Sequence, residues 1–256
     1  MRIGAQVPLL LLLSLFLSGA VGEESVTTTD STDSAVRQAP DFRSIKDRAI
    51  RKGAFINYVT SQARPILHRI ERERTILLSL YLRYRSGESL SSEEQQWVFE
   101  LAQIRKVKKF SSDSEESWSE LLMRTDGIPL SLIIAQAALE SAWGTSRFAR
   151  EGNNYFGIWC FQPGCGMVPN RREEGATHEV EQYPDLRAGI ENYIYILNTR
   201  SAFEELRRLR HQQRLNLLTP SGTFVLRGLG LYAKDGEEYM SLIEKIISQN
   251  RLGQYD

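Results

Sequence analysis

The sequence predicts a mainly helical protein that carries one small β-hairpin. Apolar residues recur at helical spacing among Arg, Lys and Glu over residues 41–109, which indicates a long helical region. A strongly apolar segment at 128–144 has Pro129 in its first turn and ends at a glycine, as expected of a buried helix. Two extended segments at 166–172 and 176–183 flank a Glu-Glu-Gly turn sequence, which predicts the hairpin.

The N-terminal segment is typical of a secretory signal. A basic residue precedes an apolar stretch at 7–17, and small residues follow it, with Ala20 and Gly22 suited to the two specificity positions of a signal peptidase. We therefore expect residues 1–22 to be removed. The apolar stretch is shorter than the roughly 20 residues that span a bilayer, so an uncleaved anchor is the less favoured alternative, and no transmembrane span is expected after cleavage.

The region that follows the signal has two parts. Residues 23–40 are rich in Thr, Ser and Asp, a composition that predicts a disordered spacer. Residues 41–113 form the predicted N-terminal helical region. Within it, Pro65 should break or kink the helix, and Ser86-Gly87 followed by Ser91-Ser92-Glu93-Glu94 indicates a loop and a fresh helix start.

The charge balance excludes one broad class of function. The chain has 32 basic and 32 acidic residues, and removal of the signal takes away only one basic residue. A nucleic-acid-binding protein would normally show a basic excess or stripe. We therefore expect no nucleic-acid partner, and the arginines of the helical region are better explained as solvated helix faces than as contacts to an anionic polymer or membrane.

The two cysteines predict a disulfide. Cys160 and Cys165 enclose Phe-Gln-Pro-Gly, a turn sequence that can bring two thiols together in an oxidising compartment. A structural zinc site needs four ligands, and the chain offers only three histidines besides these thiols. No glycine-rich phosphate loop is present either. We expect no metal and no other cofactor.

Glu140 is the leading candidate for chemistry. It lies near the end of the apolar 128–144 segment, in helical register with Ile133, Gln136 and Ala137. Apolar burial and the negative end of the helix dipole both disfavour its ionised form, and a raised carboxyl pKa is what a general acid needs near neutral pH. The alternative is a structural acid that pairs with an arginine such as Arg147 or reaches solvent.

A dense aromatic cluster follows Glu140. Six of the chain's 24 aromatic residues lie within 143–161: Trp143, Phe148, Tyr155, Phe156, Trp159 and Phe161. Glycines and asparagines interrupt them, so we expect loops there, with some rings lining a cleft and others packing a small core. Exposed rings beside amide donors suit pyranose rings, which makes Trp143, Asn154, Tyr155, Phe156 and Trp159 candidate sugar-binding residues.

Three ordered motifs carry a resemblance to a known family. They are Ala-Leu-Glu140-Ser-Ala-Trp-Gly-Thr-Ser, Gly-Asn-Asn-Tyr-Phe-Gly-Ile-Trp at 152–159, and Leu-Tyr232-Ala-Lys-Asp235 before a last helix that starts near Tyr239. Together they resemble the glucosaminidase domain of glycoside hydrolase family 73, here placed at residues 114–252. The longer architecture is similar to bacterial Bax-type proteins, from about residue 41 onward.

The resemblance implies a lysozyme-like helical lobe with a small β-hairpin lobe, and hydrolysis of the β-1,4 bond after N-acetylglucosamine. Glu140 matches the family's catalytic acid and Tyr232 its substrate-positioning tyrosine. The family's second carboxylate lies on the β lobe, where Glu179 is our first candidate and Glu174 our second. Catalysis can also proceed without it, because the N-acetyl oxygen of the sugar can act as nucleophile. If Glu179 instead positions water, inversion is expected, with carboxyls ~6.5 to 9.5 Å apart.

Three function classes follow from these observations. The first is an endo-β-N-acetylglucosaminidase that cuts the glycan strands of peptidoglycan. The second is a lytic transglycosylase or muramidase, which also relies on one acidic glutamate. The third is a non-catalytic peptidoglycan-binding scaffold. For each we expect an exported monomer in the periplasm or associated with the cell envelope.

Overall fold

The computed structural model describes residues 38–170, 172 and 175–256. The expected signal, most of the expected spacer, and Glu174 lie outside these residues. The helices are α2 (Arg48–Arg85), α3 (Ser92–Ile104), α4 (Glu115–Arg124), α5 (Leu130–Glu140), α6 (Arg147–Gly152), α7 (Leu186–Thr199), α8 (Glu204–Leu215), α9 (Gly222–Val225) and α10 (Gly236–Gln249). Short 3₁₀ turns are η1 (Ser201–Phe203), η2 (Leu226–Leu229) and η3 (Leu252–Tyr255). The strands are β1 (Trp159–Cys160), β2 (Gly166–Met167) and β3 (Glu179–Glu181).

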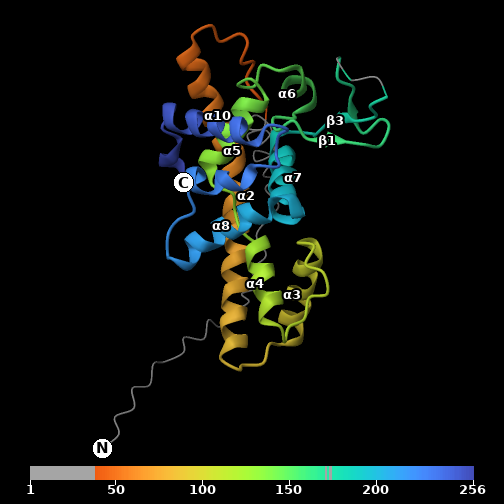
Figure 1. Ribbon diagram of the computed structural model, residues 1–256, viewed down its shortest axis with the longest axis vertical. Helices are drawn as coiled ribbons and strands as arrows, with labels where there is room; N and C mark the ends of the chain where they lie inside the picture. Colours follow the sequence, from red (N-terminus) through yellow and green to blue (C-terminus); the bar gives the residue numbers. More distant parts are fainter. Residues whose placement is uncertain (1–37, 171, 173–174) are drawn as a thin grey trace, which may run out of the picture.

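The long helix α2 runs through both halves of the molecule, as Figure 1 shows. Asp47 caps its first turn by accepting hydrogen bonds from two backbone N–H groups. The helix continues through Pro65, so the break predicted there is wrong. Ala63 and Ile66 on either side of the proline are buried in the core, and this packing offsets the roughly 3 kcal/mol that an interior proline costs.

Two hydrophobic cores lie along α2. The larger core joins its N-terminal half to α5, α7 and α10. The smaller one surrounds the buried Trp118 and joins the C-terminal half of α2 to α3 and α4. A capping box of Ser91 and Glu94 starts α3, as the sequence predicts. The domain boundary expected at residue 113 therefore separates two helices that share the smaller core.

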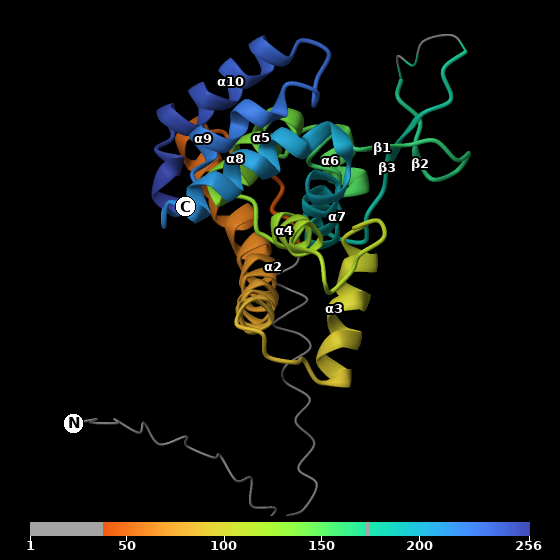
Figure 2. The same cartoon turned by 60° about the horizontal axis from the view of Figure 1, so that its bottom comes forward.

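The β lobe projects from the helical body, as seen in Figure 2. Its sheet is antiparallel with strand order β1-β3-β2. The pairing of β2 with β3 confirms the predicted hairpin, although its paired arms are shorter than expected. The strand β1 lies where we expected only loops, and it pairs with β3 so that Trp159 is opposite Val180. A two-residue strand carries no periodic signal of its own, because its existence depends on its partner.

The mainly α fold predicted from the sequence is confirmed, and a helical body beside a small sheet is consistent with a lysozyme-like fold. Within the part of the chain that the structure describes, no helix is long and apolar enough to cross a membrane.

Candidate active site

The helix α5 carries Glu140 at its last position. Its residues from Leu130 to Ala138 are buried, whereas Glu140 itself is half-buried. The sequence predicts a helix that extends to Gly144, but α5 ends one turn earlier. Ala142, Trp143 and Gly144 all adopt left-handed backbone conformations, with φ of 49°, 59° and 76°. Such conformations are costly for residues with a Cβ and often occur at functional sites. Here they turn the chain sharply away directly after the acid.

An aromatic contact from the N-terminal segment stabilises this turn. A Cβ on Gly144 would lie 2.3 Å from the ring of Phe42, which is buried. Only glycine therefore lets this ring pack against the turn after Glu140. The segment just before α2 is in this way part of the lobe that holds the acid.

The surroundings of Glu140 disfavour its ionised form. Burial raises the pKa of this carboxyl, and a hydrogen bond from the Tyr239 hydroxyl partly opposes that rise. Among the described residues, no Lys, Arg or His nitrogen lies within ion-pairing distance of it. Arg147, the partner considered from the sequence, instead donates to the carbonyl oxygen of Val168 at 2.7 Å and lies 4.0 Å from Glu151. The structural ion pair is therefore contradicted, and a neutral carboxyl able to donate a proton is favoured.

Three of the residues predicted to bind sugar are buried. Asn154 is the centre of a loop, since its amide donates to the carbonyls of Ile158 and Glu181 and its oxygen accepts from the N–H groups of Phe156 and Ile158. Tyr155 and Phe156 are each 1% exposed. Burial therefore leaves these side chains no surface for direct contact with a sugar. They shape the loop that faces Glu140 instead.

The other predicted sugar-binding residues keep accessible surface. Trp159 is 51% exposed, and its ring stacks on that of His178 with centroids 3.9 Å apart. Trp143 is half-buried and meets Phe55 edge-on. Tyr232 is half-buried, and its hydroxyl donates to the carbonyl oxygen of Phe156 at 2.9 Å. This last hydroxyl already has a partner, so Tyr232 presents mainly its ring.

Glu179 is held by the loop between the cysteines. One carboxylate oxygen accepts from the N–H of Gly164 at 3.0 Å and the other from the N–H of Gly166 at 2.8 Å. These bonds, followed by the nearby charge of Arg172, lower the pKa of the carboxyl. Both oxygens are thus already engaged in organising the β lobe. Glu174, the second candidate, lies outside the described residues.

Cys160 and Cys165 form the predicted disulfide. Their sulfurs and the Glu179 carboxylate lie close together, but sulfurs joined to each other are not thiolate ligands. The disulfide closes the loop whose N–H groups bind Glu179. The three side chains thus form one structural unit of the β lobe.

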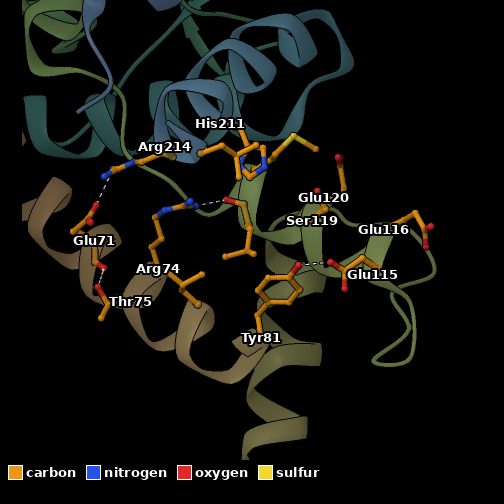
Figure 3. A pocket seen from close by; sticks show the side chains of 14 residues that line it. Glu71, Arg74, Thr75, Tyr81, Glu115, Glu116, Ser119, Glu120, His211 and Arg214 are labelled. Carbon is orange, nitrogen blue, oxygen red and sulfur yellow. Dashed lines mark hydrogen bonds and ion pairs between the residues drawn. The ribbon is translucent and has the colours of Figure 1, made fainter. Parts of the chain in front are cut away.

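A cavity of about 780 Å³ opens between α2, α4 and α8 (Figure 3), and Glu140 is not among the residues that line it. Both of its arginines are paired: Arg214 lies 3.0 Å from Glu71, and Arg74 lies 3.7 Å from the buried Asp126 behind the cavity wall. Tyr81 donates to Glu115 at the other end. The acids that line it are exposed except Glu120, which forms an ion pair with Arg124, so none of them is a half-buried acid without a cationic partner, as Glu140 is.

Sequence reasoning did not identify the polar contact that Glu140 makes with another helix, or the residue that supports that contact. Tyr239 donates to it from α10, and Gln136 donates to the Tyr239 hydroxyl at 2.8 Å. Gln136 is four residues before Glu140, one helical turn away on the same face. A polar residue at that position in an otherwise apolar helix is the signal that could have revealed that Gln136 takes part in the site.

The comparisons with known proteins agree with these features. The chain is 29% identical to Protein bax of Escherichia coli (strain K12) over 275 residues, covering 98% of this chain and 95% of that relative. No solved structure matches it. The Glucosaminidase family, described as mannosyl-glycoprotein endo-beta-N-acetylglucosaminidase, matches residues 116–252 and includes Glu140, the β lobe and Tyr239. The chain belongs to the Glucosaminidase family.

Proposed function

We propose that this protein is an endo-β-N-acetylglucosaminidase that hydrolyses the β-1,4 bond after N-acetylglucosamine in the glycan strands of peptidoglycan. Family membership supports a glycoside hydrolase. The observation that carries the finer proposal is the half-buried Glu140 carboxyl, whose pKa is raised by burial and which no described cationic side chain neutralises. A carboxyl of this kind can deliver a proton to a leaving oxygen near neutral pH.

In the proposed reaction Glu140 gives its proton to the glycosidic oxygen as the bond from that oxygen to C1 breaks. The N-acetyl carbonyl oxygen of the same sugar bonds to C1 and forms a cyclic intermediate. Glu140, now a carboxylate, then takes a proton from water while the water oxygen attacks C1. The bond between C1 and the N-acetyl oxygen breaks, which opens the cyclic intermediate and restores the N-acetyl group. The product is a reducing-end N-acetylglucosamine with retained anomeric configuration.

The engaged state of Glu179 supports this substrate-assisted route over a second protein carboxylate. Its two oxygens already accept N–H groups of the disulfide loop. A nucleophile or water-positioning base would have to give up at least part of that bonding. We assign Glu179 to holding the β lobe, so that the exposed ring of Trp159 is presented to the glycan strand.

The half-buried rings of Trp143 and Tyr232 complete the proposed sugar-binding surface. They come from distant parts of the sequence that both lie near Glu140. Trp143 follows the acid by three positions, and the pKa of the Tyr232 hydroxyl is raised mainly by burial and further by nearby groups that include the Glu140 charge. Apolar ring faces suit the faces of pyranose rings. We expect these rings to orient the strand and Glu140 to cleave it.

The deciding experiment compares wild type with Glu140→Gln on purified sacculi, with soluble products identified by mass spectrometry. Glu140→Gln should release no product, because the amide cannot donate an acidic proton. Glu151→Gln is the matched control, since Glu151 is exposed and lies at the surface pair with Arg147. Cleavage by the Glu140 variant would refute the mechanism.

The same products separate the alternatives. Reducing-end N-acetylglucosamine supports the proposal, whereas reducing-end muramic acid indicates a muramidase and an anhydro-muramic end a lytic transglycosylase. Binding of sacculi with no release by wild type would indicate the scaffold. We also propose that the protein acts outside the cytoplasm as a monomer, and the disulfide is compatible with export.

A further inference from the structure

A chain of hydrogen bonds links three helices to Glu140. The Tyr193 hydroxyl of α7 donates to Oε1 of Gln136 on α5. Nε2 of Gln136 donates to the hydroxyl oxygen of Tyr239 on α10 at 2.8 Å. The Tyr239 hydroxyl in turn donates to the Glu140 carboxyl. Gln136 is 0% exposed and Tyr193 is 1% exposed, so water does not compete for the bond between these two side chains.

The chemistry of the amide fixes the direction of this chain. An amide nitrogen only donates and an amide oxygen only accepts, whereas a hydroxyl can do either. Because Tyr193 supplies a proton to Oε1, Gln136 must direct Nε2 at Tyr239. The Tyr239 oxygen is then an acceptor toward Gln136, and its own proton is free to be donated to Glu140.

We propose that Tyr193 is a positioning residue: it holds the Gln136 amide with Nε2 toward Tyr239, and this keeps the Tyr239 hydroxyl donating to Glu140 and the catalytic carboxyl in place. This inference rests on the proposed function of Glu140 and adds to it the device that orients the acid. Neither Tyr193 nor the Gln136 amide that it orients touches the reacting atoms. Both act through Tyr239, whose ring also stacks on Tyr232 with centroids 5.4 Å apart.

The arrangement leaves Glu140 with a neutral donor as its described partner. The titratable groups that face it are Tyr193 of α7, Tyr232 of the loop before α10, and Tyr239 of α10. Among the residues with described positions, α2, α9 and η3, which also pack on α5, bring no acidic or basic group that shifts the pKa of Glu140. A hydroxyl fixes the orientation of the carboxyl without the full ionising effect of an arginine, so the carboxyl keeps a proton to give.

Tyr193→Phe tests the proposal most sharply. The ring, stacked on Phe156, is retained, but Oε1 of Gln136 loses its donor. A rotation of the amide then lets Oε1 accept the Tyr239 proton, which is diverted from Glu140. Activity falls as pH rises through the pKa of a general acid, and losing a donor to the ionised form raises that pKa. The basic limb of the pH profile of kcat/KM should therefore move upward by about one unit.

The other variants make this prediction specific. Tyr239→Phe should move the limb in the same direction by a similar amount, and the double variant with Tyr193→Phe should move it no further. Gln136→Met removes the amide altogether and leaves Tyr239 with Glu140 as its acceptor, so its limb should stay close to wild type. Tyr81→Phe is the matched control, since it removes a hydroxyl that donates to Glu115, far from Glu140.

A purely structural role would give a different pattern. Each variant would then lower the melting temperature and kcat while leaving the limb unmoved, and Gln136→Met would be at least as damaging as Tyr193→Phe. An unmoved limb in Tyr193→Phe, or greater damage by Gln136→Met than by Tyr193→Phe, overturns the proposal. Direct titration of the Glu140 carboxyl carbon by NMR gives the same comparison without activity. The positioning role thus fails if that carbon titrates unchanged in Tyr193→Phe, whereas the proposed function is tested separately, by the products that wild type and Glu140→Gln release from sacculi.

Discussion

Gly157 lies directly against the carboxyl group of Glu140. A Cβ built on Gly157 would stand 3.0 Å from Oε2 of Glu140, and the glycine has a φ of +64°. Backbone conformation and space therefore both require glycine here. The loop that Asn154 organises thus brings an unobstructed stretch of backbone up to the acid.

Replacing Gly157 with alanine should lower kcat strongly, whereas its loss of stability should be no larger than that of a control glycine at a similar φ. The added methyl would displace the carboxyl or occupy space next to its proton, and a misplacement of about 1 Å can cost on the order of 10²-fold in rate. Gly87→Ala is the matched control, because Gly87 also has a positive φ, +82°, with nothing near its missing Cβ. Both variants should lose about 1 to 2 kcal/mol of stability from backbone strain. Equal kcat in both variants would contradict the prediction that Gly157 approaches a catalytic carboxyl.

The sequence predicted the parts of this site that depend on local signals. Glu140 stands out because a single acid ends a strongly apolar helix, and the disulfide follows from a short turn between two cysteines. Burial in the aromatic cluster could not be predicted in the same way. Tyr155 and Phe156 are core residues while Trp159, three positions on, is exposed. The difference depends on which helices cover the loop, and no pattern within the loop itself records that.

Ionisation of Glu140 should cost stability. Burial raises the pKa of this carboxyl in the folded state. A carboxyl with a raised folded pKa stabilises the protein below its unfolded pKa, and this contribution is lost as pH rises through the folded value. Glu140→Gln should therefore melt at a higher temperature than wild type at pH 7 to 8, with the difference vanishing at low pH. Thermal unfolding at a series of pH values tests this, and a lower melting temperature for the variant at pH 8 would contradict it.

Asp126 should be essential for stability. It is buried and lies 2.8 Å from Arg214, 3.5 Å from Arg210 and 3.7 Å from Arg74. These ion pairs join the segment just before α5 to α8 and α2. Asp126→Asn leaves buried guanidinium groups without their counter-charge and should cost ~3 to 5 kcal/mol in urea unfolding at pH 7. The exposed pair of Glu205 and Arg208 is the control, and Glu205→Gln should cost under about 1 kcal/mol.

The contribution of Asp126 should also depend on pH. Burial opposes its ionisation, but Arg210, Arg74 and Arg214 outweigh that effect and lower its pKa. A depressed folded pKa means that the stabilisation is present above the unfolded value, about 3.9, and is lost as pH falls through the folded value. The gap in stability between wild type and Asp126→Asn should therefore narrow in acid. A gap that is constant from pH 7 to pH 3 would show that the charge of Asp126 contributes nothing.

Glu179→Gln should loosen the β lobe without abolishing cleavage. The amide keeps one oxygen acceptor, but its NH₂ group faces one of the two N–H groups that the carboxylate binds, those of Gly164 and Gly166. Amide hydrogen exchange at both glycines should become faster. Wild type should release the β-anomer first, as retention requires, when products are followed by NMR. Inverted product, with loss of cleavage in Glu179→Gln, would show instead that Glu179 positions water.

How far the sequence predicts the β lobe depends on the range of the interactions. The hairpin of β2 and β3 was predictable from its turn, whereas the pairing of β1 with β3 joins segments about 20 residues apart and has no local signal. The same holds for Glu179, which the family resemblance suggests as the second catalytic carboxylate. Only the folded loop shows that its oxygens bind backbone N–H groups.

Trp159 should bind glycan rather than take part in the chemical step. It is the exposed ring of β1, and the ring of His178 stacks against it and holds its orientation. Trp159→Ala should raise KM for sacculi about tenfold, since stacking on an aromatic side chain contributes on the order of 1 kcal/mol or more, while kcat stays within about twofold. His178→Ala should raise KM less, because the tryptophan remains but loses its support. Phe99→Ala, which removes an exposed ring of α3, should leave KM unchanged. A fall in kcat with unchanged KM for Trp159→Ala would place this ring at the reacting bond and not along the strand.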